Sequence, residues 1–252
     1  MKRIESPNNI CRHFLALELI KKLSFSEFLE IGIGDGAFLE KLAQKEYRGV
    51  GIDVSEQAIS IASARLKRYS NIAIENKNFF EVTKKFDLVI MLQVLEHIEN
   101  DSEALAKTKQ LVKKGGNFLL SVPAHKEKWG YLDLVGGHYR RYEKEEIVKL
   151  LKDSGFEVLC FYSLGYPITN FFKVWEENFY KKYFFLNNFS QKTNEERTKI
   201  SGCVEIPGVF GFPAVCKVFI NEIALFPFLQ LQRLFVKTEL GLNYLILAKN
   251  KN

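Results

Sequence analysis

The sequence lacks the features of a disulfide-bonded or membrane-spanning protein. Its cysteines stand far apart, at Cys11, Cys160, Cys203 and Cys216, and no Cys-x-x-Cys pair occurs. We therefore expect reduced, mostly buried thiols. The N-terminus has no apolar signal core, and charged and polar residues interrupt the longest apolar stretch, at 204–229. Because a spanning helix needs about 20 nearly uncharged residues, we expect a cytoplasmic protein.

The composition that remains is that of an ordinary globular protein without internal repeats. The chain has 252 residues, of which 47% are hydrophobic and 26% are charged, so a large core can form. We expect a single domain with elaborations. The net charge of +6 comes with scattered lysines, which permits nucleic-acid binding without requiring it.

Helical and strand-like patterns alternate along most of the chain. Apolar spacing predicts a helix over 8–23 that covers the front of the domain. Further helices are predicted at 37–45, 55–68, 101–113 and 143–154. Strands are predicted at 27–31, 48–53, 71–75, 86–91, 116–122 and 156–162. Asp101 or Ser102 can cap the helix at 101–113, and Gly115 with Gly116 can end it. The alternation predicts an α/β protein, with a parallel sheet covered by helices on both faces.

The segment 164–240 is rich in Phe, Tyr and Leu and predicts a helical insertion before a final strand at 244–248. A polar break within it, at 187–202, predicts a mobile loop. Six aromatic residues are spaced for one apolar helical face: Phe171, Phe172, Trp175, Phe179, Tyr180 and Phe184. Three interpretations stay open. The insertion is a cap on the sheet edge, a lid over a substrate pocket, or a surface over 164–236 that contacts a membrane or an apolar acceptor.

The most informative stretch is the first predicted strand, which runs into three alternating glycines, Gly32, Gly34 and Gly36. Glycine removes the Cβ atom and permits φ > 0, so the backbone can approach a ligand closely. The second predicted strand ends at Asp53, whose carboxylate can accept both hydroxyls of a ribose. This pattern is typical of binding an adenosine-containing ligand. A tight turn without a ligand is the alternative, and the position of Asp53 argues against it.

Charge distinguishes between two adenosine ligands. Gly32-x-Gly34-x-x-Ala37 also satisfies the loose dinucleotide pattern. However, Glu30 and Asp35 bracket the turn and would repel a dianionic pyrophosphate. The ammonium and sulfonium groups of S-adenosylmethionine are attracted by acids, so the turn favours that ligand.

Four later segments extend the motif: Lys77-Asn78-Phe79-Phe80, Phe86-Asp87-Leu88-Val89-Ile90, Val94-Leu95-Glu96-His97-Ile98 and Leu111-Val112-Lys113-Lys114-Gly115-Gly116-Asn117. Together with the glycines and Asp53, they resemble the class I S-adenosylmethionine-dependent methyltransferases over residues 28–122. The resemblance implies a three-layer, Rossmann-like sheet of seven strands in the order 3-2-1-4-5-7-6, with strand 7 antiparallel. It also implies S-adenosyl-L-methionine as the cofactor and S-adenosyl-L-homocysteine as the product.

The resemblance also implies roles for individual residues. Glu30 and the glycines would hold the methionine end, with Gln93 lining it. Asp53 would bind the ribose hydroxyls, and Val54 would lie beside the adenine. Asn78 replaces an aspartate that often faces the adenine amino group, and its amide oxygen can accept the same hydrogen bond. The expected cofactor contacts are Glu30, Gly32, Gly34, Gly36, Asp53, Val54, Asn78, Phe79 and Gln93.

An absence after the fourth strand bears on the acceptor. Met91-Leu92-Gln93-Val94 stands where methyltransferases of base amines usually carry Asn/Asp-Pro-Pro-aromatic, so DNA is not expected as a substrate. The following Val94-Leu95-Glu96-His97 is similar to small-molecule methyltransferases, including the ubiquinone-type O-methyltransferases. We expect a small or lipid-linked acceptor.

The loop 129–142, with its Gly-His-Tyr-Arg-Arg-Tyr pattern, resembles a bacterial methyltransferase group of glycan, lipid and secondary-metabolite pathways. Arginine forks suit carboxylate or phosphate oxygens. Alternatively, Arg140 and Arg141 form salt bridges with Glu143, Glu145 or Asp133. The expected acceptor contacts are Trp129, Tyr131, Tyr139, Arg141 and Tyr142.

A hydroxyl acceptor must lose a proton, and imidazole, with an ordinary pKa of about 6.5, suits that task. We expect His138 or His97 to be the catalytic base, with loop bracing as the alternative for His97. No metal is expected, because adjacent residues rarely share one metal. A site built from Glu96, His97 and a third ligand is the competing arrangement.

Two other functions stay open. An RNA-directed methyltransferase is suggested by the basic balance and would need a continuous basic face. A regulatory protein would hold the cofactor without turnover. The sequence does not indicate the oligomeric state.

Overall fold

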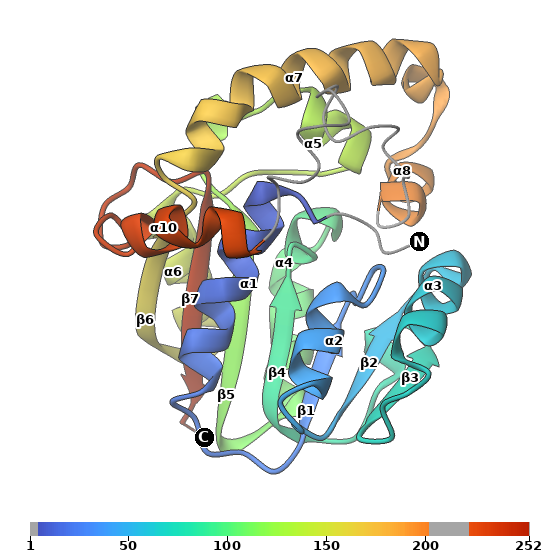
Figure 1. The fold of residues 1–252 in the computed structure, drawn as a ribbon. Helices are drawn as coiled ribbons and strands as arrows, with labels where there is room; N and C mark the ends of the chain where they lie inside the picture. The colour runs from blue at the N-terminus through green and yellow to red at the C-terminus, as the bar shows by residue number, and fades with distance from the viewer. Residues whose placement is uncertain (1–4, 202–221, 252) are drawn as a thin grey trace.

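The computed structural model describes residues 5–201 and 222–251, and its centre is a seven-stranded sheet (Figure 1). The strand order is β3-β2-β1-β4-β5-β7-β6, and β7 runs antiparallel to both of its neighbours. The expected topology is therefore confirmed. The strands are β1 Phe28–Ile31, β2 Gly49–Asp53, β3 Ile72–Asn76, β4 Phe86–Leu92, β5 Val112–Pro123, β6 Phe156–Leu164 and β7 Asn243–Asn250.

Helices connect and cover these strands. The α-helices are α1 Pro7–Ile20, α2 Ala37–Ala43, α3 Glu56–Leu66, α4 Asp101–Leu111, α5 Tyr131–Gly136, α6 Lys144–Asp153, α7 Ile168–Leu186, α8 Asn194–Ser201 and α10 Glu222–Gln232. Single 3₁₀ turns are η1 Phe79–Glu81, η2 Leu95–His97, η3 Lys126–Lys128 and η4 Phe189–Gln191. No helix among the described residues is long and apolar enough to cross a membrane.

The sheet is buried on both faces, which is why its parallel strands are nearly continuous apolar runs. On one face, α1, α2 and α3 pack against residues such as Phe28 and Leu88. On the other face, α4 and α6 pack against residues such as Val89 and Phe118. These layers make the three-layer α/β architecture that Figure 1 shows.

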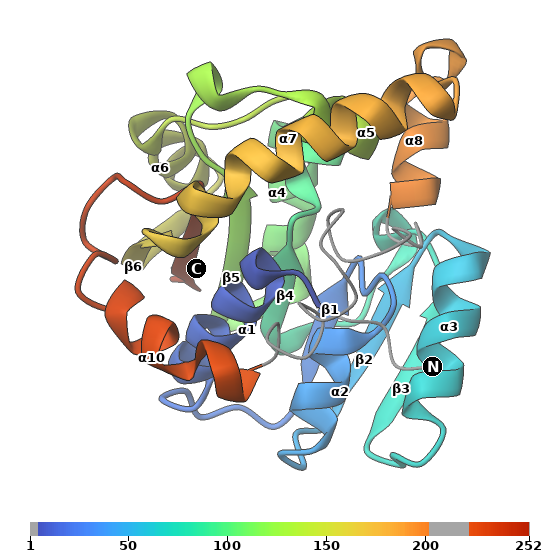
Figure 2. The same ribbon diagram turned by 45° about the horizontal axis from the view of Figure 1, so that its top comes forward.

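The insertion crosses the edge of the sheet at which the parallel strands end. In both views α7 lies over this edge, with α5 beneath it and α8 descending from its far end (Figures 1 and 2). Apolar contacts join α7 to α5, with Tyr180, Phe184, Phe189 and Val135 buried between them. Phe171, by contrast, is 73% exposed and does not share the buried face expected for it. The insertion thus stands over the place where α/β sheets bind ligands.

Three local expectations differ from the structure. Asn100, rather than Asp101 or Ser102, caps α4, because its side chain accepts the Glu103 amide. Strand β5 begins at Val112, before Gly115 and Gly116, which lie in a register shift opposite β4. Residues 187–202 were expected as a loop, yet 189–191 and 194–201 are helical.

The described cysteines are free: Cys11 is buried and Cys160 is half-buried. Cys203, Cys216 and most of the apolar stretch at 204–229 lie outside the described residues.

Candidate functional site

The turn after β1 has the backbone geometry that its glycines predict. Gly32, Gly34 and Gly36 have φ values of 74°, 52° and 74°, a region that side chains with a Cβ rarely adopt. A Cβ on Gly32 would also come within 2.4 Å of a Val94 methyl carbon. Since β1 and β2 are paired in parallel, the turn lies directly beside the end of β2.

Asp53 joins this turn to the end of β2. Its carboxylate accepts the Gly34 amide at 2.9 Å through one oxygen and the Ser55 amide at 2.9 Å through the other. Burial raises the pKa of Asp53, and backbone hydrogen bonds oppose that rise. The carboxylate is therefore held in one orientation at the carboxyl edge of the sheet.

Glu30 is the second acid of the turn, and it lies deeper. Its side chain is buried, and its Oε2 atom has no hydrogen-bond partner among the described residues. Burial, then the neighbouring Asp35 and Asp53, raise the pKa of Glu30 well above its ordinary value. An orphaned buried carboxyl is costly, so this position suits a ligand that brings a positive charge.

Asp35 does not contribute the free charge that the sequence suggested. Its carboxylate forms a salt bridge with Arg65, with an N–O distance of 2.7 Å, and accepts the Ala37 amide. Its negative charge is thus largely compensated. The electrostatic preference of the turn for a cation rests mainly on Glu30 and Asp53.

Arg12 on α1 is a buried cation that sequence reasoning missed. Its Nη2 atom donates to Asn9 at 2.7 Å, whereas its buried Nε atom has no described partner. Burial lowers the pKa of Arg12 to about 10, and the neighbouring Glu96 opposes that shift. Arg12 has an unused Nε donor and Glu30 an unpaired Oε2 atom, and these complement the carboxylate and the ammonium of an amino-acid moiety. The residues present therefore fit S-adenosylmethionine.

The remaining expected cofactor residues line the same edge. Val54 is half exposed beyond β2. Asn78 caps η1, because its amide oxygen accepts the Phe80 amide at 3.1 Å, and Phe79 is buried. Gln93 follows β4 directly, has φ at 58° and donates to the Ser121 hydroxyl at 3.2 Å. Such strained backbone is common at functional sites.

The loop after β5 is organised by a buried acid, Asp133. This residue is fully buried and accepts hydrogen bonds from His138 at 2.8 Å and from Arg141 at 2.9 Å through both oxygens. It also accepts the Gly130 amide at 2.9 Å. Burial favours the neutral acid, but the His138 and Arg141 partners prevail and lower the pKa of Asp133. One carboxylate thus orients an imidazole and a guanidinium.

A largely enclosed cavity of about 40 Å³ lies beside this network. Its lining joins the ends of the sheet strands to the insertion and consists of Asn8, Gln93, Pro123, Leu132, His138, Arg141, Lys173, Glu177, Leu242 and Asn243. The cavity brings Gln93 on the expected cofactor side together with His138 and Arg141 on the expected acceptor side. Lys173 and Glu177 come from α7, and no local sequence signal connected them with the site.

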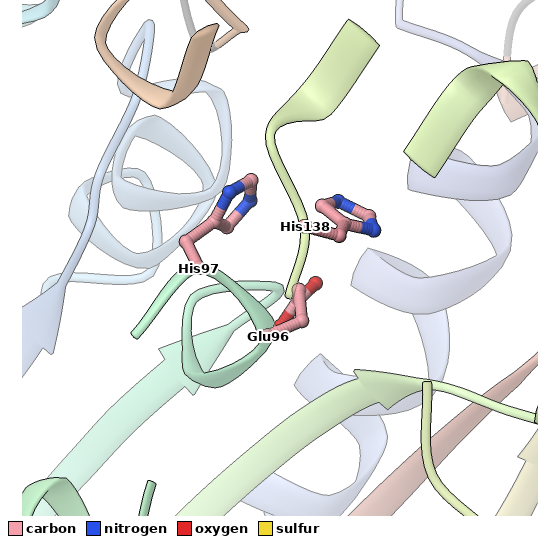
Figure 3. A group of neighbouring side chains, drawn as sticks. All are labelled: Glu96, His97 and His138. Atoms are coloured by element: carbon pink, nitrogen blue, oxygen red, sulfur yellow. The ribbon is translucent and has the colours of Figure 1, made fainter. Parts of the chain in front are cut away.

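Glu96, His97 and His138 form a compact group (Figure 3). One ligand atom from each lies within 4.8 Å of the others, so the third member that the sequence could not name for a metal site is His138. Burial raises the pKa of Glu96 to about 7, and both carboxylate oxygens lack described partners. Burial and the nearby His138 lower the pKa of His97 to about 3. The group can hold a metal, or it can line this part of the site without one.

Two predicted acceptor contacts lie away from the cavity. Tyr142 is fully buried in the core, and its hydroxyl donates to Asp101 at 3.1 Å, which leaves it no surface with which to touch an acceptor. Tyr131 packs its ring against Phe184 and Phe185. Their aromatic character predicts acceptor contact, but α5 turns Tyr131 toward α7, and the bridge between Tyr142 and Ala124 places Tyr142 in the core.

The remaining loop residues line a surface depression, and the arginines among them form salt bridges. Trp129 and Tyr139 line a shallow, open depression together with Lys126, Arg140 and Arg141. Arg140 bridges to Asp101 at 2.6 Å, a partner that the sequence did not suggest. The alternative role of salt bridging is therefore observed for both arginines.

Comparisons with known proteins show what this chain is similar to. A family model described as a methyltransferase domain matches residues 6–160, more than half of the chain. A ubiquinone biosynthesis O-methyltransferase of Leptothrix cholodnii is 24% identical over 172 residues, covering 60% of this chain and 73% of the relative. A demethylmenaquinone methyltransferase of Tropheryma whipplei is 25% identical over 161 residues, covering 63% and 65%.

Solved structures add a relative of different acceptor chemistry. The N-methyltransferase NodS of Bradyrhizobium japonicum, in complex with S-adenosyl-L-homocysteine, superposes with a TM-score of 0.52 and 26% identity. The match covers 61% of this chain and 77% of that protein. Because the similar proteins include both an O- and an N-methyltransferase, similarity alone leaves the acceptor atom open.

Proposed function

We propose that this chain, which belongs to the methyltransferase domain family and is a class I S-adenosylmethionine-dependent enzyme, methylates an oxygen atom of a small or lipid-linked acceptor. One observation carries the choice of oxygen. The imidazole of His138 lines the cavity, and its Nδ1 atom is bonded to the buried Asp133. A hydroxyl needs a base to become a good nucleophile, and this histidine is oriented to serve as one.

On the cofactor side, Asp53 would hold the ribose hydroxyls, and Glu30 with Arg12 would hold the charged groups of the methionine end. S-adenosylmethionine supplies an electrophilic methyl group on a sulfonium when it is bound. The glycine turn allows close approach, and Gln93 would separate the methionine end from the acceptor. Alignment of this kind supplies much of the acceleration in a displacement reaction.

On the acceptor side, His138 would accept the hydroxyl proton at Nε2, which has no described hydrogen-bond partner. The bond from Nδ1 to Asp133 selects the tautomer in which Nε2 carries a lone pair, and it stabilises the imidazolium that forms. Asp133 is then a positioning residue. It touches His138 rather than the acceptor.

His97 is the weaker candidate for the base. Its pKa of about 3 opposes proton uptake at neutral pH, and it does not line the cavity. Its Nδ1 atom instead meets the Thr198 hydroxyl of α8 at 3.2 Å, and its ring stands edge-on to His138. These contacts support a bracing role between η2 and the insertion.

Transfer of labelled methyl from S-adenosylmethionine tests the proposal. Catechols should be methylated, whereas matched anilines should not be. Full activity after dialysis against a chelator, with no stoichiometric metal in the purified protein, would support the histidine base over the competing metal site. Methylation of anilines alone would overturn the proposal for oxygen. The absence of transfer to any acceptor, with intact cofactor binding, would favour a regulatory protein.

We also propose that the insertion contacts a membrane surface when the acceptor is lipid-linked. Large apolar side chains are exposed on α7 and around α10, a pattern that supports an interfacial role. They are Phe171, Phe185, Leu186, Ile223, Phe226, Phe228, Leu231 and Leu234. A basic balance of +6 would add attraction to an anionic bilayer.

A further inference from the structure

Two cations, Arg141 and Lys173, line the cavity beside His138, and each keeps donor capacity that no described residue uses. Arg141 is 6% exposed and donates Nε to Asp133 and Nη1 to the Ala124 carbonyl at 3.0 Å. Within the described residues, its Nη2 atom has no hydrogen-bond partner. Arg141 also lines the cavity. Because guanidinium donors are arranged as a fork, the unused nitrogen is available to an acceptor in that space.

Lys173 supplies the second cation. Its ammonium donates to the Lys128 carbonyl at 3.2 Å, and it forms no salt bridge within the part of the chain that the structure describes. Burial lowers the pKa of Lys173, the neighbouring Arg141 and Lys128 lower it further, and Glu177 and Asp133 oppose that shift.

The two acids nearby are already engaged. Asp133 is bonded to His138, Arg141 and the Gly130 amide. Glu177 accepts the Tyr131 amide at 2.7 Å. Neither of them pairs with Lys173. An anion that entered the cavity would find two cationic donors with unused hydrogen-bonding capacity.

The size of the cavity fits a small anionic group. A volume of about 40 Å³ holds roughly three water molecules, which is comparable to one carboxylate or phosphate group. Leu132, Pro123 and Leu242 form an apolar part of the wall, and the amides Asn8, Gln93 and Asn243 form a polar part. An acceptor with an apolar body and one anionic group matches this mixture.

We propose that Arg141 and Lys173 form an anion subsite, and that the methyl acceptor therefore carries a carboxylate or a phosphate beside its hydroxyl-bearing part. This inference rests on the proposed function for the identity of the acceptor, but the subsite itself does not require turnover. Lys173 comes from α7, so the insertion contributes a specificity-determining residue rather than only a cover.

Calorimetric titration of the full chain with S-adenosyl-L-homocysteine present tests the subsite. The probes are benzoate, phenyl phosphate and the neutral isostere benzamide. We expect saturable binding of at least one anion, with the tighter one identifying the group, and no binding of benzamide. Lys173→Gln should weaken the anion about tenfold, the loss of one charge-assisted hydrogen bond. Lys182→Gln, an exposed lysine on the same helix, should leave binding unchanged.

The absence of saturable anion binding would overturn the subsite, as would equal weakening by Lys182→Gln. Arg141 variants are less informative, because Arg141 also holds Asp133. Activity then separates this inference from the proposed function. If 3,4-dihydroxybenzoate and 3,4-dihydroxybenzamide are methylated equally well, and Lys173→Gln changes neither rate, the subsite fails and methyl transfer stands. If the protein binds the anion but methylates neither compound, the result would support the subsite and contradict the proposed function.

Discussion

The turn after β1 and the loop after β5 meet at the same edge of the sheet, but they are built differently. The turn at 32–36 is formed mainly by main-chain atoms: three residues with positive φ and the adjacent Asp53 carboxylate make a cradle. The loop at 129–142 is a side-chain device. Its imidazole and guanidinium are held by Asp133, and α7 supplies Lys173 and Glu177 to the wall of the cavity beside it.

The difference teaches where specificity resides. A backbone cradle accepts a ligand common to a whole family, because it depends on the chain path rather than on particular side chains. A side-chain network depends on partners far apart in the chain. His97, for example, meets Thr198 across 101 positions. The acceptor side can therefore differ between relatives while the cofactor side stays recognisable.

The largest expected effect is on the rate of methyl transfer and concerns the acceptor side of the site. His138→Ala should lower kcat by about 10² to 10⁴-fold, because a positioned base contributes that much. His97→Ala should have a much smaller effect on kcat. Initial rates of labelled methyl transfer measure both effects, and S-adenosyl-L-homocysteine affinity serves as the control that should stay constant. A larger loss for His97→Ala would reverse the assignment.

The next effect concerns Glu96, which lies where the two regions meet. Its folded pKa of about 7 exceeds the ordinary 4.5, so the unfolded chain releases this proton first as pH rises. The stability contributed by the neutral acid is fully present below about pH 4.5 and is lost as pH rises through 7. Glu96→Gln should therefore raise the free energy of unfolding by about 3 kcal/mol at pH 8, and by little near pH 4.5.

Denaturant unfolding at the two pH values measures this difference. Glu99→Gln is the matched control, because Glu99 is exposed and its substitution should change stability little. Equal effects of Glu96→Gln at both pH values would show that the carboxyl is not titrating in this window.

A smaller effect, on cofactor affinity, is expected for the acids of the cofactor side. Glu30→Gln and Asp53→Asn should each weaken the binding of S-adenosyl-L-homocysteine by about 10 to 100-fold, since each removes a charged hydrogen-bond partner. Asp35→Asn should change affinity little, because Arg65 already compensates that acid. Calorimetric titration gives the three affinities.

The same titration has a pH signature. The pKa of Glu30 lies well above its ordinary value, and the ligand ammonium requires the ionised carboxylate. Affinity should therefore rise with pH, and binding should release protons into the buffer. Glu30→Gln should remove most of this pH dependence. A retained pH dependence would assign the proton to another group.

The smallest expected effect concerns the outer surface of the insertion. Ile223→Asp combined with Leu234→Asp should reduce flotation with anionic liposomes several-fold, by removing buried apolar area and adding charge. Leu159→Asp is the matched control, because Leu159 is 49% exposed on the edge strand β6 and lies outside the insertion. Wild-type protein that fails to float with anionic lipid would contradict membrane contact.

Much of the cofactor half was predictable. The glycine turn and Asp53 follow from short-range patterns, alternating strands and helices indicate a parallel sheet covered on both faces, and the family resemblance implies the strand order. Even so, the local expectation for Asp35 was incomplete, because Arg65 lies 30 positions away and only the fold brings them together. The cap of α4 was missed by one residue, which is the usual precision of helix boundaries.

The acceptor half was predictable only as a region. Residue type alone predicts Tyr142 and Tyr131 as acceptor contacts, but the fold directs them into the core and toward α7. Residue type missed Lys173, whose spacing marks it only as part of a helix. Nothing in the loop sequence shows that Asp133 becomes fully buried between His138 and Arg141, because burial is a property of the assembled elements.

By itself, the sequence determined the class of fold and the donor of the methyl group, because the glycine turn and Asp53 act through neighbouring backbone. The tertiary structure alone decided which histidine lines the cavity and which side chain orients it. It also decided that α7 supplies a cation to that cavity. These outcomes depend on long-range packing and burial, and both exist only once the insertion has folded over the sheet edge.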